Sequence, residues 1–195
     1  MQAHWFWTAL LIEIGLCGGC SLQDSSYLQY PEGVWDTRPR TVRHDLDGDD
    51  KPETIAVTQQ FDGEFTTEAV LRILNADQEV GRVAIPDHFT SLELVNLTQG
   101  RNREIVVWSE GGAHCKNLQV IQYQGNRLNK LFEASSPAGI EFRKSPDGLQ
   151  IWIARADWKD PTWNYGTGVP LWEVYAWDGA SFEHRSDLST APGPS

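Results

Sequence analysis

Acidic side chains crowd into one short stretch of the chain and are its clearest candidates for chemistry. Five carboxylates fall within nine positions: Asp45, Asp47, Asp49, Asp50 and Glu53. Carboxylates this close together repel one another unless a cation lies among them. Calcium takes about six to eight oxygen ligands, so a loop that aims several carboxylates at one point predicts a Ca²⁺ site. The alternative interpretation is a solvated acidic turn between two strands.

The acidic stretch opens the first of three similar units. Each unit begins with a polar turn that leads into an apolar run rich in β-forming residues, over 45–57, 96–108 and 142–153. Glu or Gln stands where each turn meets its run, at Glu53, Glu104 and Gln150. A period of about 50 residues indicates that one structural unit is repeated.

A second signal follows in every unit. Alternating strands flank a short turn over 70–83, 120–132 and 174–185, a pattern typical of β-hairpins. The pair Asp178-Gly179 is predicted to be the strongest of the three turns. With three or four strands in each unit, the predicted fold class is all-β, a meander repeated three times.

The first turn, DLDGDDKPE at 45–53, resembles the calcium loop of FG-GAP or VCBS repeats. These repeats occur in integrin-α-type β-propellers and many bacterial surface proteins, and their pattern is Asp-x-Asp-x-Asp-Gly-x-x-Asp before a strand. The hairpin VYAWDGASF at 174–182 is similar to the outer hairpin of such units. The resemblance implies a set of calcium ligands made of carboxylates and one backbone carbonyl: Asp45, Asp47, Asp49, Glu53 and the carbonyl of Lys51.

The resemblance also implies an architecture. It predicts three β-meander repeats over 41–187, arranged as part of a β-propeller of the integrin-α N-terminal type. Propellers generally need four or more blades to close. Three repeats therefore predict an incomplete propeller, a collapsed sandwich of the same meanders, or closure by association into a homo-oligomer, since uncovered edge strands need protection.

The later turns differ from the first. The second turn has neutral side chains at the corresponding positions: Asn96, Thr98, Gly100 and Asn102. The third turn offers Asp147 alone, so both are predicted to be structural copies without a metal. In the first turn, Asp50 stands where the family prefers Gly for a positive φ angle, and Asp tolerates that angle better than most residues.

The N-terminal segment 1–19 is predicted to be an export signal. Its apolar run at 5–16 is too short to cross a bilayer but fits the apolar region of a secretion signal. Gly18, Gly19 and Cys20 resemble the end of a bacterial lipoprotein signal. This implies a lipid on Cys20 that anchors the chain in the cell envelope, at the outer membrane or the periplasmic face. An ordinary cleaved secretion signal and a buried first element are the alternatives.

Length and charge narrow the functions further. The chain of 195 residues suits one globular domain, with 20–40 predicted to be a tether and 188–195 a disordered tail. Its formal net charge of −11 argues against nucleic acid as a partner, because that binding relies on Lys and Arg that neutralise phosphates. Such a surface favours cations instead.

A second candidate surface lies in the connections that follow the apolar runs. Aromatic, acidic and imidazole groups gather there in the sequence: Trp158, Trp163, Tyr165, Glu110 and His114. Aromatic rings in such loops stack on a sugar ring or pack on a partner protein. Cys115 lies beside His114, but neighbours on a strand point to opposite faces, so a catalytic thiol is not expected.

Two functions are consistent with these patterns. The first is an exported calcium-binding lipoprotein that acts as a structural or protein-interaction module and whose partner is a protein or a glycan. The second is a carbohydrate-active or hydrolytic enzyme that uses the aromatic rim. A pocket of convergent polar groups with shifted pKa values favours the second function, and a flat rim favours the first.

Overall fold

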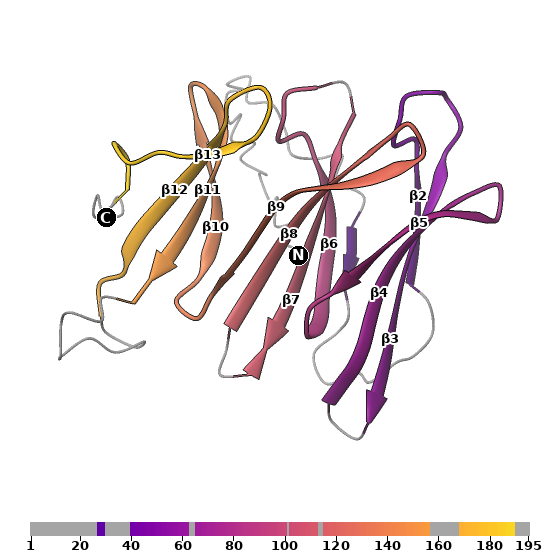
Figure 1. Ribbon diagram of the computed structural model, residues 1–195, viewed down its shortest axis with the longest axis horizontal. Helices are drawn as coiled ribbons and strands as arrows, with labels where there is room; N and C mark the ends of the chain where they lie inside the picture. Colours follow the sequence, from indigo (N-terminus) through magenta and orange to yellow (C-terminus); the bar gives the residue numbers. More distant parts are fainter. Residues whose placement is uncertain are drawn as a thin grey trace, which may run out of the picture.

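The computed structural model of the chain describes residues 27–29, 40–62, 65–100, 102–112, 115–156 and 168–189. Their strands form three antiparallel sheets that follow one another in chain order (Figure 1). This confirms the predicted all-β class and the threefold repeat of a four-stranded meander. Each sheet ends in two edge strands, so none of the three is closed. No helix within these ranges has the length and apolar composition needed to cross a membrane.

Each repeat is a run of four strands in which consecutive strands pair. The first repeat comprises β2 (Arg40–His44), β3 (Glu53–Asp62), β4 (Phe65–Asn75) and β5 (Gln78–Ile85). The second repeat comprises β6 (His88–Val95), β7 (Glu104–Gly111), β8 (Cys115–Gln124) and β9 (Arg127–Ser136). The third repeat comprises β10 (Ile140–Ser145), β11 (Gly148–Arg155), β12 (Leu171–Trp177) and β13 (Phe182–His184).

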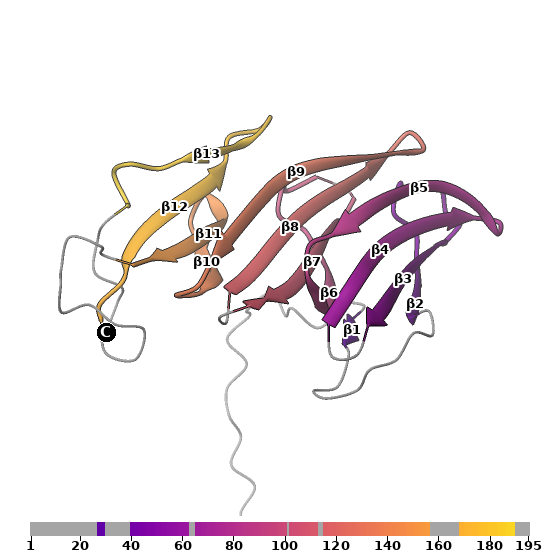
Figure 2. The same cartoon turned by 60° about the horizontal axis from the view of Figure 1, so that its bottom comes forward.

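Two apolar cores hold the three sheets together. Leu46 and Phe89, both fully buried, lie in the core between the first and second repeats. Ile151 lies in the core between the second and third repeats. Strand β7 contributes to both cores, with Ile105 in the first and Val106 in the second. Successive side chains of a strand point to opposite faces of the sheet, so one strand can supply both. The middle sheet is therefore covered on both faces, as the side view in Figure 2 shows.

Strand β1 (Tyr27–Gln29) lies within the segment 20–40 that the sequence predicts to be a tether. It pairs antiparallel with β6, with Leu28 opposite Leu92, and is the outermost strand of the second sheet. Its pairing covers part of the edge that β6 would otherwise present to other chains. The predicted tether is therefore interrupted by a strand that belongs to the domain.

Among the three hairpins predicted from the sequence, those of the first two repeats have tight two-residue turns. Ala76-Asp77 joins β4 to β5, and Gly125-Asn126 joins β8 to β9. All four residues have a positive φ between 47° and 68°, which two-residue turns need to match the twist of the flanking strands. The sequence pattern therefore predicts both hairpins correctly.

The third hairpin corrects the expectation that Asp178-Gly179 makes the strongest turn. These residues open a longer connection, 178–181, between β12 and β13. The carboxylate oxygen Oδ1 of Asp178 accepts hydrogen bonds from the backbone amides of Ala180 and Ser181, both at 2.8 Å. A side chain that caps two backbone amides stabilises a wider loop, so the Asp-Gly pair does not form a two-residue turn here.

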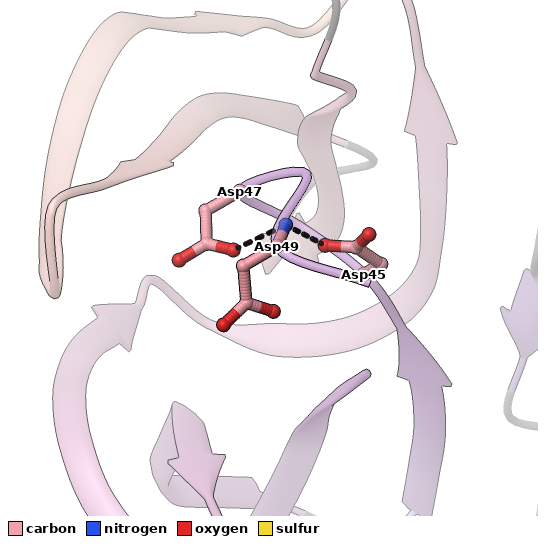
Figure 3. A group of neighbouring side chains, drawn as sticks. All are labelled: Asp45, Asp47 and Asp49. Atoms are coloured by element: carbon pink, nitrogen blue, oxygen red, sulfur yellow. Dashed lines mark hydrogen bonds between the residues drawn. The ribbon is translucent and has the colours of Figure 1, made fainter. Parts of the chain in front are cut away.

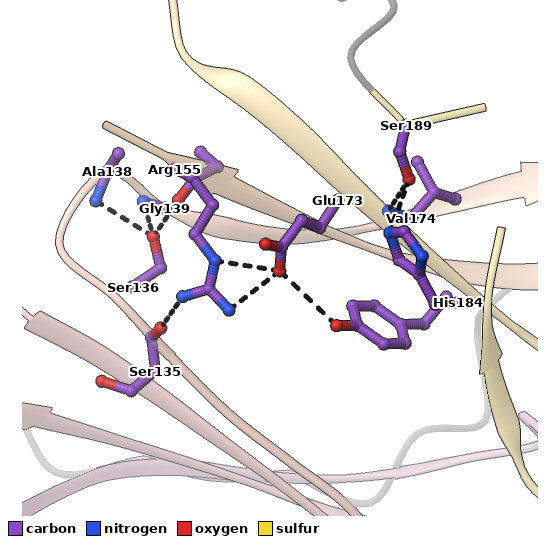
Figure 4. A network of polar contacts seen from close by, with 11 residues as sticks. Ser135, Ser136, Ala138, Gly139, Arg155, Glu173, Val174, His184 and Ser189 are labelled. Atoms are coloured by element: carbon purple, nitrogen blue, oxygen red, sulfur yellow. Dashed lines mark hydrogen bonds and ion pairs between the residues drawn. The ribbon is translucent and has the colours of Figure 1, made fainter. Parts of the chain in front are cut away.

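The chain beyond β13 turns back onto β12 (Figure 4). The backbone amides of Leu188 and Ser189 donate to the carbonyl of Arg185, at 3.1 Å and 3.0 Å. The backbone amide of Val174 in β12 donates to Ser189 Oγ at 3.2 Å. The stretch predicted to be a disordered tail, 188–195, thus has its first two residues bound to the fold.

Gln59 of β3 links the first repeat to the second from a buried position. Its side chain is 1% exposed. The amide nitrogen Nε2 donates to the carbonyl of Phe89 at 3.2 Å, and the amide oxygen Oε1 accepts from the backbone N–H of Phe89 at 2.9 Å. The side chain therefore bonds to β6 in the way a neighbouring strand does.

Replacing Gln59 with Leu should lower the free energy of unfolding by about 2 to 5 kcal/mol, because the N–H and C=O of the buried Phe89 both lose the hydrogen bond that the Gln59 amide makes with them. Urea denaturation monitored by tryptophan fluorescence measures the change. The exposed Gln78 is the control, and its replacement with Leu should alter the free energy of unfolding by less than about 0.5 kcal/mol. Equal effects of the two substitutions would contradict a structural role for the Gln59 amide.

Candidate metal centre

The first loop, 45–52, connects β2 to β3 and gathers three carboxylates (Figure 3). One carboxylate oxygen from each of Asp45, Asp47 and Asp49 lies within 4.8 Å of the other two. The structure thus brings together three of the residues that the resemblance implies as ligands. Three anionic oxygens at this separation attract a hard divalent cation.

Backbone amides fold the loop around Asp45. Gly48 N donates to Asp45 Oδ1 at 2.7 Å, and Asp50 N donates to Asp45 Oδ2 at 2.9 Å. Burial alone would raise the pKa of Asp45, but the amides of Gly48, Asp50 and Asp49 lower it below its ordinary value. The loop places Asp50 at a φ of 66°, so the positive φ expected at that position is confirmed.

Lys51 offers little compensation for the negative charge. Its backbone amide donates to Asp49 Oδ1 at 2.8 Å, and its ammonium nitrogen lies 3.7 Å from Asp49 Oδ2. The Lys51 side chain is 79% exposed, and an ion pair in water at such a distance contributes little. The Lys51 ammonium therefore leaves most of the negative charge of the first loop uncompensated.

Glu53, the first residue of β3, is fully buried beneath the first loop. Its oxygen Oε2 accepts a hydrogen bond from the backbone amide of Leu46 at 2.9 Å, but its other oxygen, Oε1, is buried without a hydrogen-bond partner. Burial raises the pKa of the Glu53 carboxyl, and the charges of Asp47 and Asp49 add to that effect. The charges of the loop aspartates thus act on Glu53, but its carboxylate is not among the three whose oxygens lie within 4.8 Å of one another.

The second loop, 96–103, is built in the same way around Glu104, the first residue of β7. Glu104 is also fully buried. Its Oε2 accepts from the backbone amides of Leu97 at 2.8 Å and of Thr98 at 3.2 Å. Its Oε1 accepts from the hydroxyl of Thr98 at 2.7 Å. Both oxygens of this carboxylate therefore have partners inside the loop.

The two loops differ at the residue that faces the buried carboxylate. Thr98 in the second loop corresponds to Asp47 in the first. The Thr98 hydroxyl donates to the buried glutamate, whereas an ionised Asp can only accept. The oxygen of Glu53 that corresponds to the one bound by Thr98 is the oxygen without a partner. A buried carboxylate oxygen without a partner lowers the stability of the fold unless a cation or a hydrogen-bond donor satisfies it.

The residues of the first loop fit Ca²⁺ on this observation. Every available ligand is an oxygen, which suits a hard cation and not the softer metals that prefer thiolate or imidazole. A cation among the three aspartates would screen their charges, and one that also reached Glu53 would give its Oε1 a partner. The chemistry that the loop can perform is therefore cation binding.

Tyr123 of β8 borders this loop from the second repeat. Its hydroxyl donates to Asn126 Oδ1 at 2.7 Å. Burial raises the pKa of Tyr123, and the charges of Glu53, Asp47 and Asp49 raise it further. The acidic loop of one repeat therefore lies against a strand of the next, so the charge of the loop acts on the junction between repeats.

The third repeat has no comparable loop. A turn at Pro146-Asp147 joins β10 to β11, and the carbonyl of Asp147 accepts a hydrogen bond from Gln99 Nε2 at 2.8 Å. Gln150, which takes the place of Glu53 in the sequence repeat, accepts at Oε1 from Trp152 Nε1 at 3.1 Å. Within the described ranges, the first loop is the only group of three or more His, Cys, Asp and Glu side chains close enough to share a metal.

The predicted aromatic rim is described only in part. Glu110 lies on β7 opposite His88 of β6 and is exposed. Cys115 is half-buried, and its Sγ lies 2.8 Å from Ser135 Oγ. His114, Trp158, Trp163, Tyr165 and the predicted lipid attachment site Cys20 lie outside the described residues.

Sequence reasoning did not single out Thr98. In the sequence it belongs to a turn without carboxylates, and the only signal was its alignment with Asp47. Its role emerges from the distance between its hydroxyl and Glu104. Comparison with protein-family models, with curated proteins and with solved structures found no match to this chain.

Proposed function

We propose that this protein is an exported, lipid-anchored, calcium-binding β protein of FG-GAP or VCBS type that serves the cell envelope as a structural or protein-interaction module. The observation that carries the calcium part is the buried, unpartnered Oε1 of Glu53 beside three converging aspartates. The ligands in this proposal are carboxylate oxygens and one carbonyl: Asp45, Asp47, Asp49, Glu53 and the carbonyl of Lys51.

The second loop supports this assignment as an internal reference. With the same backbone plan, it satisfies Glu104 through the hydroxyl of Thr98 and so needs no metal. The first loop has three carboxylates in place of the neutral residues and leaves Glu53 Oε1 open. A cation supplies for the first loop what a hydroxyl supplies for the second.

Open sheet edges support the interaction role. The three sheets end in the edge strands β2, β5, β1, β9, β10 and β13. Such edges offer unpaired backbone groups to another chain, which suits a module that binds a protein partner or a second copy. In the proposal, the three meanders are the blades of a partial propeller of the integrin-α N-terminal type.

Calcium should raise the melting temperature of the chelator-treated protein by about 5 to 10 °C at a concentration near one hundred times the dissociation constant, because the ion binds the folded state alone. Isothermal titration calorimetry should give one site. The triple variant D45N/D47N/D49N is the test of location and should lose both the heat of binding and the thermal shift. Unchanged melting at saturating calcium in the original protein would remove the site.

The lipid anchor has its own test. Replacing Cys20 with Ala in the expressed precursor should abolish acyl-chain labelling and move the protein from the membrane fraction to the soluble fraction, because one thiol carries the lipid. Cys115→Ala is the matched control and should leave labelling intact. Membrane association that survives Cys20→Ala would remove the anchor from the proposal while leaving the calcium site untouched.

A further inference from the structure

A cavity of about 290 Å³ lies under the second loop. It is lined by four residues of the loop and its end, and by two residues at the end of β8: Thr98, Gly100, Asn102, Glu104, Gln122 and Gln124. Its volume is close to the lower end of ligand pockets, at ~300 Å³. The cavity belongs to neither the acidic group of the first loop nor the aromatic rim.

Three side-chain amides line this cavity, those of Asn102, Gln122 and Gln124. Among the residues that the structure describes, none offers a hydrogen-bond partner to these three side chains. The buried amide of Gln59, by contrast, is hydrogen-bonded through both its nitrogen and its oxygen. Each of the three cavity amides offers two donors and one acceptor. The cavity therefore presents a converging set of unused hydrogen-bonding groups.

The charge of the described lining disfavours two classes of ligand. None of the described residues that line the cavity is Lys or Arg, so they offer an anion no positive charge. The one carboxylate, Glu104, already accepts hydrogen bonds from the amides of Leu97 and Thr98 and from the Thr98 hydroxyl. A hard cation finds no second carboxylate in this lining, in contrast to the first loop.

We propose that this cavity binds a neutral, hydroxyl-rich ring the size of a single sugar or cyclitol. Hydroxyl groups are both donors and acceptors and so match amides, which offer both. The volume accommodates one ring and not the several residues of an extended peptide. The proposal does not rest on calcium, and the site is at the end of the sheets where β7 begins, opposite the end where β3 and β7 finish (Figure 1).

Asn102 also connects the cavity to the first loop. A Cβ atom at Gly48 would lie 3.4 Å from Asn102 Oδ1, so this amide borders the backbone of the acidic loop. Binding is therefore measured at one fixed, saturating calcium concentration and again in chelator. Ring binding that persists in chelator leaves the cavity proposal standing even where the calcium proposal fails.

The test uses methyl α-D-glucopyranoside, methyl α-D-galactopyranoside, N-acetyl-D-glucosamine and myo-inositol as probes, followed by NMR of the side-chain amide signals. At least one probe should shift the signals of Asn102, Gln122 and Gln124, with a dissociation constant in the millimolar range expected for a ligand of about a dozen heavy atoms. Triglycine and sulfate serve as the contrasting probes, and tighter binding of either would overturn the proposal.

Variants fix the location of binding. Q122A/Q124A should weaken binding about tenfold or more, because the ring loses two of its three amide partners. Gln124 is exposed and Gln122 half-buried, so the double variant should keep the melting temperature; Asn102→Ala provides a second, independent weakening. Gln78→Ala, which removes an exposed amide of the first repeat, should bind like the original protein. Binding by Q122A/Q124A within about twofold of the original, or no shift with any of the four rings, would overturn the proposal.

Discussion

Replacing Glu104 with Ala should lower the free energy of unfolding by about 3 to 6 kcal/mol, which is a large part of the total stability of an ordinary domain. The substitution removes the acceptor of three hydrogen bonds, from Leu97 N, Thr98 N and Thr98 Oγ1. The side chain is fully buried, and the loss of all three bonds at one position leaves the second loop without its central acceptor. Urea denaturation of the chelator-treated protein measures the loss.

The same substitution at Glu53 is the matched control, because the two residues hold equivalent places in their repeats. Glu53→Ala removes one hydrogen bond, from Leu46 N. It also removes a buried charge that lacks a partner on one oxygen and is repelled by Asp47 and Asp49. The two effects oppose each other, so in chelator the free energy of unfolding should change by no more than about 1 kcal/mol.

The two variants should differ in how their stability depends on calcium. In saturating calcium, Glu53→Ala should become clearly destabilising relative to the original protein, because a ligand of the ion is gone, whereas the effect of Glu104→Ala should not depend on calcium. Equal losses for Glu53→Ala and Glu104→Ala in chelator would mean that Glu53 Oε1 has a partner within the protein, and the case for the ion would fail.

The sequence predicts the strands well because apolar runs alternate with polar turns along the chain. Runs such as that of β7 place Ile105 and Val106 in two different cores, so they read as continuously apolar. The turns at Ala76-Asp77 and Gly125-Asn126 contain Asp77, Gly125 and Asn126, which accept a positive φ readily, whereas Ala76 adopts one without that preference. The arrangement of the sheets relative to one another depends on contacts between repeats, which no local pattern encodes.

Local sequence rules fail where hydrogen bonds from a side chain determine the conformation of the backbone. Asp178-Gly179 matches a two-residue turn, but the Asp178 carboxylate bonds to Ala180 N and Ser181 N and favours a longer loop. Strand β1 has only three residues, too few to show a period. Its existence follows from the edge of β6 with which it pairs.

The sequence predicts which acidic residues form the candidate site but not how the buried glutamates are hydrogen-bonded. Asp45, Asp47 and Asp49 are recognised by spacing, and the structure brings their oxygens within 4.8 Å of one another. The buried position of Glu53 and the bond from the Thr98 hydroxyl to Glu104 become visible only when the two loops are compared in three dimensions. The three amides at the cavity were invisible in the sequence, because Gln122 and Gln124 read as ordinary strand residues.

Replacing Asp47 with Thr should make the first loop independent of calcium. The new hydroxyl takes the place that Thr98 has in the second loop, where it donates to Glu104 at 2.7 Å, and it supplies the missing partner of Glu53 Oε1. In chelator, the free energy of unfolding should rise by about 1 to 3 kcal/mol, because a hydrogen bond to a charged acceptor forms and one repelling carboxylate disappears.

The same variant should respond less to calcium than the original protein does. With one of the three converging carboxylates gone, the shift of about 5 to 10 °C expected for the original protein should fall below about 2 °C. Asp47→Val is the matched control, since valine has the shape of threonine without the hydroxyl; it should lose the calcium shift and gain less stability in chelator. Equal melting temperatures of the Thr and Val variants in chelator would show that the hydroxyl makes no bond to Glu53, and retention of the full calcium shift by Asp47→Thr would place the ion elsewhere.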